Sequence, residues 1–398
     1  MVNVSMSVVA SLSPLLFLTF RSLYNISFSM LGALVLINFC TQLTVDLILS
    51  FYSHKFNLSK MVKITPVLTA LGLFVYAVFP FIFPNEVYIG LVIGTVIFSA
   101  SGGLAEVLIS PVIAELPSDN PEREMSKLHS IYAWGVVVVV IISTLLLLVF
   151  GKENWQWLAL FWMIVPLISC CLFLKSTVPP LKTPEKVSNV FSLIKQKDFI
   201  VCFLCIFLGG ASECTMAQWS SSYLEKAINI PKVWGDIFGV AMFAVMLGLG
   251  RTLYSKYGRN ICKTLAVSAM GATVCYMVAT FSSVPVIGLV SCVMTGLCTA
   301  MLWPGSLIMA SDKFPSAGIA VFALMAAGGD LGGAIGPQLV GAVADIAMTN
   351  VHIHNLSATL NMTMEQMAMK IGLMSAIAFP LLAAILYLKI YKKKQSAQ

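Results

Sequence analysis

Apolar stretches of about 20 residues, separated by short polar segments, follow one another along the whole chain. A helical stretch of that length crosses the hydrocarbon core of a bilayer. Only 10% of the 398 residues are charged and 59% are hydrophobic, whereas about 25% of a soluble domain is charged. A chain with this few charges cannot cover a water-facing surface. Lipid must therefore be its solvent. The sequence predicts an integral, multi-pass membrane protein.

The apolar stretches number twelve, and each must be helical because hydrocarbon offers no hydrogen-bond partner to free backbone groups. The predicted spans are residues 2–20, 27–51, 62–83, 87–114, 128–150, 155–174, 199–224, 234–254, 261–281, 284–309, 317–347 and 369–390. The predicted fold class is therefore an all-α membrane protein with twelve transmembrane helices in two six-helix bundles.

A polar segment rich in Lys, Pro and Ser separates the first six spans from the last six. We expect an N-terminal six-helix bundle at 1–180, a cytoplasmic linker at 181–198 and a C-terminal six-helix bundle at 199–398. With a cytoplasmic N-terminus, the large majority of the 24 Lys and Arg residues fall in cytoplasmic loops, as the positive-inside rule requires. We therefore expect both termini in the cytoplasm, a bacterial plasma (inner) membrane and a monomer surrounded by the lipid bilayer.

Several function classes are disfavoured by what the sequence lacks. It contains no HExxH or GxSxG motif, and its 10 cysteines include no CxxC pair matched by a second Cys or His pair. The net charge of +7 is explained by basic cytoplasmic loops. We expect no enzyme activity, no metal, no cofactor and no nucleic-acid partner.

Acidic residues inside the predicted spans need a reason, because a charge at mid-membrane costs at least about 2.5–3.5 kcal/mol. Glu106 lies in SGGLAEVLISP, where Gly102, Glu106 and Ser110 recur every four residues and share one helix face. No basic residue lies within two helical turns of Glu106, and an apolar environment favours a neutral carboxyl group. We interpret Glu106 as a proton carrier; the alternative is a protonated glutamate that serves packing.

Two further acids are candidates for proton coupling. Glu213 lies in GGASECTMAQWSSSYLE, whose small and polar residues suit the lining of a wet cavity, and Trp219 there can stack on a sugar ring or anchor the helix at the membrane interface. Asp330 lies in MAAGGDLGGAIGPQLVGAVAD, where close packing explains the glycines but not the acid.

Asn38, Gln42 and Asp46 are spaced by four and form a polar stripe, which faces protein or water rather than lipid. Asp46 lies nearer the cytoplasm, and it serves either the inner gate or the site itself. The predicted substrate-binding residues are Asn38, Gln42, Gln218, Trp219 and Trp303, and the predicted gating residues are Asp46, Arg251 and Asp345.

The stretches GLAEVLISPVIAELP and MSKLHSIYAWG resemble helices 4 and 5 of the fucose permease-like sugar:proton symporters of the major facilitator superfamily. LWPGSLIMASDKFP and GGAIGPQLVGAVAD resemble helices 10 and 11 of that family. The resemblance places Glu106 on the family's helix 4 glutamate and Asp345 on the aspartate that ends helix 11. It implies a substrate site between two six-helix halves. The stretch ASLSPLLF departs from the family, because Pro14 stands where an acid serves sugar binding and coupling.

We therefore expect a secondary active transporter that takes up a sugar or another small polar metabolite together with protons by alternating access. A proton-antiport exporter of a small metabolite or drug is one alternative, and the absence of a Gly-x-x-x-Gly-Pro motif from residues 128–150 counts against it. A non-transporting membrane receptor is another, and the lack of long soluble extensions counts against it.

Overall fold

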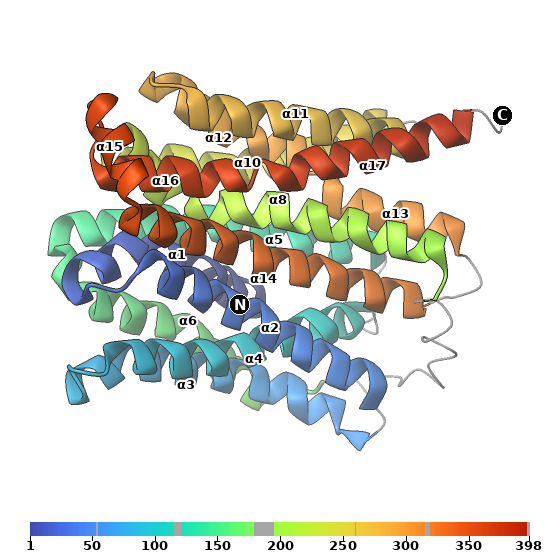
Figure 1. The fold of residues 1–398 in the computed structure, drawn as a ribbon. Coiled ribbons are helices and arrows are strands. Elements are labelled where there is room, and N and C mark those ends of the chain that lie inside the picture. The colour runs from blue at the N-terminus through green and yellow to red at the C-terminus, as the bar shows by residue number, and fades with distance from the viewer. Residues whose placement is uncertain (53–54, 115–120, 179–194, 259, 315–318, 396–398) are drawn as a thin grey trace. The chain divides into compact units, whose positions relative to one another are not determined.

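The computed structural model describes residues 1–52, 55–114, 121–178, 195–258, 260–314 and 319–395, which are almost entirely helical and contain no β-strand (Figure 1). The helices are α1 (Val2–Tyr24), α2 (Phe28–Tyr52), α3 (Leu58–Ile82), α4 (Val87–Ala114), α5 (Pro121–Phe150), η2 (Lys152–Asn154), α6 (Trp155–Lys175), α8 (Lys197–Ile228), α9 (Lys232–Trp234), η3 (Gly235–Ala241), α10 (Met242–Tyr257), α11 (Ile261–Phe281), α12 (Pro285–Thr299), α13 (Leu302–Lys313), α14 (Ile319–Thr349), α15 (Val351–Thr359), α16 (Met364–Ser375) and α17 (Ala378–Gln395).

Most of these helices are membrane spans by length and composition. Within the described residues, 11 helical segments are long and apolar enough to cross a membrane, and Trp134–Phe150 in α5 is a shorter apolar segment. The predicted all-α membrane fold class with twelve spans is confirmed.

The chain divides into two compact units. The first unit comprises Met1–Ile26 and Ile37–Val187, and the second comprises Ser27–Leu36 and Ser188–Gln398. The first turns of α2 therefore pack with the second unit, and the rest of α2 packs with the first. The predicted linker at 181–198 lies for the most part outside the described residues, so its bounds and those of the two bundles stay a prediction.

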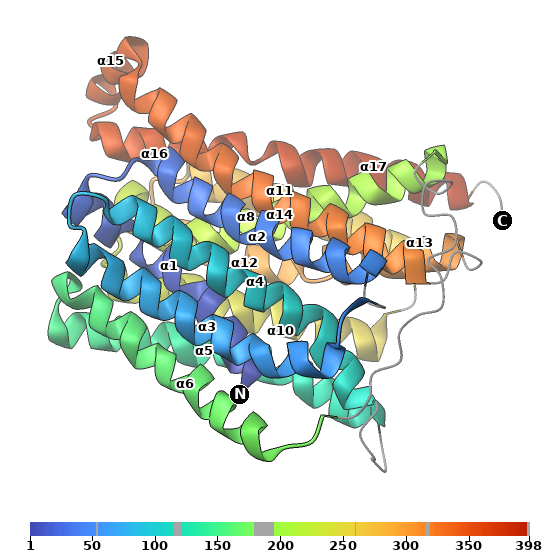
Figure 2. The same cartoon turned by 90° about the horizontal axis from the view of Figure 1, so that it is seen from below.

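An aromatic core organises the first unit. The buried ring of Tyr76 lies 5.8 Å from Trp155 and 5.6 Å from Phe98, measured between ring centroids, and its hydroxyl lies 3.0 Å from Ser13 Oγ. α3 and α4 run side by side (Figure 2). Their approach is close because Gly72 of α3 lies against α4: a methyl group at Gly72 would lie 2.5 Å from the backbone N of Phe98.

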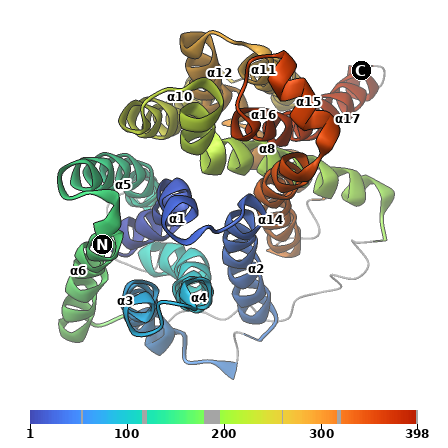
Figure 3. The ribbon, with the colours of Figure 1, turned by 60° about the vertical axis from the view of Figure 1, so that its left-hand side comes forward.

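The second unit is built around α8. This helix lies between α14 on one side and the group of α11, α12 and α17 on the other (Figure 3). α8 and α14 approach each other through small residues, because a methyl group at Gly210 would lie 2.5 Å from the backbone O of Gly329. On the other side, the buried Tyr276 hydroxyl of α11 donates to Ser212 O at 2.7 Å. These contacts hold α8 closely against α14 and α11.

Two predicted single spans are interrupted helices. The span at 284–309 consists of α12 and α13, with a break at Ala300 and Met301, and the span at 369–390 contains the break between α16 and α17. A proline explains each break, because proline has no N–H to donate to the carbonyl four residues earlier. Pro304 cannot bond Ala300 O in the first span, and Pro380 cannot bond Ala376 O in the second. The short helix α15 is an element that the sequence analysis did not foresee.

Candidate functional site

The polar stripe of α2 lies against α4 inside the first unit. Asn38 Oδ1 accepts hydrogen bonds from Ser99 Oγ at 2.6 Å and from Gln42 Nε2 at 3.1 Å. Gly102 of α4 makes room for this contact, because a methyl group there would lie 3.3 Å from the Gln42 amide. Residues spaced by four on α2 thus meet a row of small residues on α4, and the two amides are held side by side.

Two carboxyl groups continue this contact along the same pair of helices. Asp46 packs at Gly103, where a methyl group would lie 3.0 Å from Asp46 Oδ1. That oxygen is buried and accepts no hydrogen bond. Glu106 lies one turn further along α4, its side chain is exposed, and it is near enough to Asp46 for their charges to interact. Among the described residues, neither acid has an ion-pair partner.

The second unit places an acid and a base together within the membrane. Arg251 Nη2 of α10 lies 3.3 Å from Glu213 Oε1 of α8, and Arg251 Nε donates to Ala300 O at 3.2 Å. This carbonyl is available because Pro304, four residues later, has no N–H to donate to it. The break between α12 and α13 therefore supplies one of the groups that position Arg251. The structure brings together Glu213, predicted to couple protons, and Arg251, predicted to act at a gate.

Asp330 and Trp303 lie deeper in the second unit. Asp330 is buried on α14, directly after Gly329. The Trp303 indole of α13 covers this glycine, since a methyl group at Gly329 would lie 2.5 Å from Trp303 Cζ2. Trp303 thus packs against the residue that precedes Asp330, and the roles predicted for the two, substrate binding and proton coupling, stay predictions.

Trp219 of α8 serves packing within the second unit. It is fully buried, its Nε1 donates to Pro337 O at 2.9 Å, and its ring centroid lies 6.1 Å from that of Phe28 at the start of α2. Its neighbour Gln218 is half-buried. The observed contacts of Trp219 join α8 to α14 and to the first turn of α2. The substrate-binding roles of Trp219 and Gln218 stay predictions.

Asp345 near the end of α14 caps α2. Its Oδ1 accepts from the backbone N of Phe28 at 3.0 Å, and its Oδ2 accepts from the backbone N of Ser29 at 2.6 Å. The first N–H groups of a helix have no partner inside the helix, and a carboxylate there also interacts favourably with the helix dipole. The carboxylate thus fixes the start of α2 to α14, and a gating role for Asp345 stays a prediction.

One buried charge pair was missed by the sequence analysis. Asp236 of the π-helical segment η3 is fully buried, and both of its carboxylate oxygens lie 3.0 Å from Lys232 Nζ. Ser221 Oγ of α8 donates to the same carboxylate. The spacing of four between Lys232 and Asp236 was the available signal. A π-helical turn is frequent at functional sites, so this pair belongs among the candidate polar groups.

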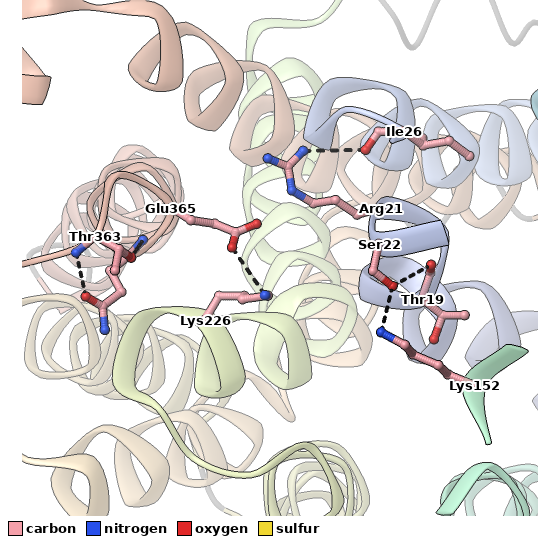
Figure 4. A network of polar contacts seen from close by, with 9 residues as sticks. Thr19, Arg21, Ser22, Ile26, Lys152, Lys226, Thr363 and Glu365 are labelled. Atoms are coloured by element: carbon pink, nitrogen blue, oxygen red, sulfur yellow. Dashed lines mark hydrogen bonds and ion pairs between the residues drawn. The ribbon is translucent and has the colours of Figure 1, made fainter. Parts of the chain in front are cut away.

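Polar contacts also hold the helix ends of each unit (Figure 4). In the first unit, Lys152 Nζ donates to Ser22 Oγ at 3.2 Å. In the second unit, Lys226 Nζ lies 3.2 Å from Glu365 Oε2, and both side chains are about one-third exposed. Such exposed pairs contribute little to stability.

Within the part of the chain that the structure describes, no group of three or more His, Cys, Asp or Glu side chains is placed to hold a metal ion.

Apolar helices in this number, with acids and amides inside the bundles, define an integral multi-pass membrane protein. The family model described as Major Facilitator Superfamily matches residues 1–337. The chain belongs to this superfamily of membrane transporters, as the sequence predicted. No curated protein matches the sequence.

Solved transporters share the fold. A D-xylose-proton symporter has 16% identity and a TM-score of 0.69, with 95% of this chain and 94% of that chain covered. The nucleoside transporter NupG has 13% identity and a TM-score of 0.71, with 98% and 99% covered. A variant of the E. coli fucose:proton symporter FucP has 14% identity and a TM-score of 0.60, with 97% and 96% covered. At these identities the likeness shows the fold alone.

Proposed function

We propose that this protein is a secondary active transporter that takes up a sugar or another small polar metabolite together with protons, and that Glu106 carries the proton. The observation that carries this proposal is the position of Glu106, which lies on a membrane-spanning helix beside Asp46 and has no ion-pair partner among the described residues. The predicted roles of Glu213 and Asp330 in coupling remain secondary candidates.

The chemistry of this pair favours proton exchange. A charge inside the membrane is costly, and two neighbouring carboxylates repel each other, so the state that holds a proton is favoured while the pair is shielded from water. When the pair gains access to water of higher pH, the proton can leave. A group that binds and releases a proton as access alternates couples the proton gradient to transport.

The amides beside the acids support a hydroxyl-rich substrate. Asn38 and Gln42 offer donors and acceptors, and Ser99 adds a hydroxyl, which is the mixture that recognises sugar hydroxyl groups. Two of the solved transporters with this fold are sugar:proton symporters. That likeness supports a sugar or a related metabolite as the substrate class.

The test is uptake by purified protein in liposomes. The wild type should accumulate its substrate when an inward proton gradient is imposed. Glu106→Gln, which keeps the shape but cannot release a proton, should reduce accumulation to the level of protein-free liposomes and leave substrate exchange intact. Glu86→Gln, which removes an exposed acid just before α4, is the control and should behave like the wild type. Wild-type accumulation by Glu106→Gln would refute the assignment.

A further inference from the structure

Arg251 is the residue of the second unit whose position calls for a ligand. It lies within the membrane span Lys232–Tyr254, yet 48% of its side chain is exposed. A cation inside a membrane span faces a cavity or a partner and marks a pathway for ions or substrates, because lipid cannot accommodate it. The exposed part of its side chain is therefore accessible to a ligand that enters such a cavity.

The contacts of Arg251 leave much of its binding capacity unused. A guanidinium group has five N–H groups. One at Nε is bonded to Ala300 O and one at Nη2 to Glu213 Oε1. The described residues supply no acceptor for the other three.

Glu213 also satisfies Arg251 incompletely. The pair is joined by one contact of 3.3 Å, whereas the strong arrangement of a guanidinium and a carboxylate has two parallel hydrogen bonds. The second oxygen, Glu213 Oε2, is buried and accepts no hydrogen bond. A carboxylate that made two hydrogen bonds to Arg251 could therefore displace Glu213 from it.

Space for a ligand exists on the same helix. Gly248 lies three residues before Arg251 and so shares its face of α10. A methyl group at Gly248 would have no protein atom within 4 Å, apart from the backbone of α10 itself. The exposed guanidinium therefore has open space beside it, on the side of α10 that carries Gly248.

We infer that Arg251 binds a carboxylate group of the substrate and that Glu213 is its counter-ion at rest. This inference rests on the proposed function and names the substrate class: a small, hydroxyl-rich carboxylic acid such as a sugar acid. The substrate carboxylate takes a two-bond position on the guanidinium and displaces Glu213. A phosphate ester fits less well, because it carries up to two negative charges and Arg251 is a single cation.

The test measures binding to the purified protein in detergent, without a proton gradient. The probes are matched pairs that differ at one carbon: D-glucose with D-glucuronate, D-galactose with D-galacturonate, and galactitol with D-galactonate. D-glucose 6-phosphate is the phosphate arm. Binding is followed as ligand-dependent stabilisation against heat and by equilibrium titration. We expect at least one acid to bind and its neutral partner to bind at least about tenfold more weakly.

Substitutions at the two residues should act in opposite directions. Arg251→Gln should weaken binding of the acid about 10- to 100-fold, because charge-assisted hydrogen bonds are lost. Glu213→Gln should tighten it, because the competing carboxylate is gone. The double variant, Arg251→Gln with Glu213→Gln, has no unpaired charge, and it should fold and bind as weakly as Arg251→Gln. Lys256→Gln removes an exposed cation from the same helix and is the control, with wild-type affinity.

The outcomes separate this inference from the proposed function. Equal binding of a sugar and its acid, binding of the phosphate ester alone, or binding of no acid in the series overturns the carboxylate assignment. So does unchanged affinity in Arg251→Gln and in the double variant. Proton-driven uptake of a neutral sugar would overturn the inference and leave the proposed function standing. Acid binding that depends on Arg251, without Glu106-dependent accumulation, would do the reverse.

Discussion

The two units treat the acids of their membrane-spanning segments differently. In the first unit, Asp46 and Glu106 lie among glycines and amides, and neither has an ion-pair partner within the described ranges. In the second unit, Glu213 lies beside Arg251, and Asp236 lies beside Lys232. A carboxyl group without a cation can be neutralised only by a proton, whereas one beside a cation can stay charged. The first arrangement suits proton exchange and the second suits recognition of charge.

The largest effect should come from giving the first unit a cation. Gln42→Lys places an ammonium group one turn from Asp46 on α2. A permanent cation keeps the carboxyl pair charged, so proton-driven accumulation should fall to the level of protein-free liposomes. Gln42→Met, of similar size and uncharged, is the comparison: the loss of the amide should weaken substrate affinity, but at saturating substrate this variant should still accumulate substrate in the same uptake assay. Full accumulation by Gln42→Lys would show that the absence of a cation is unimportant.

A smaller effect is expected from removing a cation of the second unit. Lys232→Met leaves the fully buried Asp236 carboxylate without its lysine, which should lower the free energy of unfolding by about 3 kcal/mol. Lys226→Met breaks the exposed pair with Glu365 and should lower it by at most about 1 kcal/mol. Unfolding of the purified variants in detergent gives both values. Equal losses would mean that burial does not distinguish the two pairs.

The smallest effect concerns the amides of the first unit. Ser99→Ala removes one of two hydrogen bonds to Asn38 Oδ1 and should lower the free energy of unfolding by about 1 kcal/mol. Thr44→Val removes an exposed hydroxyl that bonds only within α2, and it should change the value by less than about 0.5 kcal/mol. Thermal unfolding compares the two. A loss in Thr44→Val as large as that in Ser99→Ala would contradict a specific role for the contact between α2 and α4.

The sequence could predict whatever depends on local spacing. Apolar length marked the spans, and spacing of four placed Asn38, Gln42 and Asp46 on one face of α2, where the structure has them facing α4. Glu106 was found because an acid in an apolar stretch is costly wherever the helix packs. These signals need no knowledge of which helices are neighbours.

Pairing between helices could not be predicted. Glu213 and Arg251 are 38 residues apart in the chain, and only the packing of α12 with both α8 and α10 brings them together. Trp219 shows the same limit, because neither the sequence nor its period tells whether an indole meets a substrate or the carbonyl of Pro337. Asp236 was passed over because it stands at the end of a predicted span, where acids are common, and the π-helical turn buries it.

The cap that Asp345 forms on α2 has a consequence for any attempt to divide the protein. The chain passes into the second unit at Ser27 and returns to the first after Leu36, so the units are joined by three covalent connections rather than one. A fragment that ends at Val187 would carry the first turns of α2 without the carboxylate that bonds their N–H groups. Each of two such fragments therefore lacks a part of the unit that the other contains, and we expect neither to form a complete unit alone.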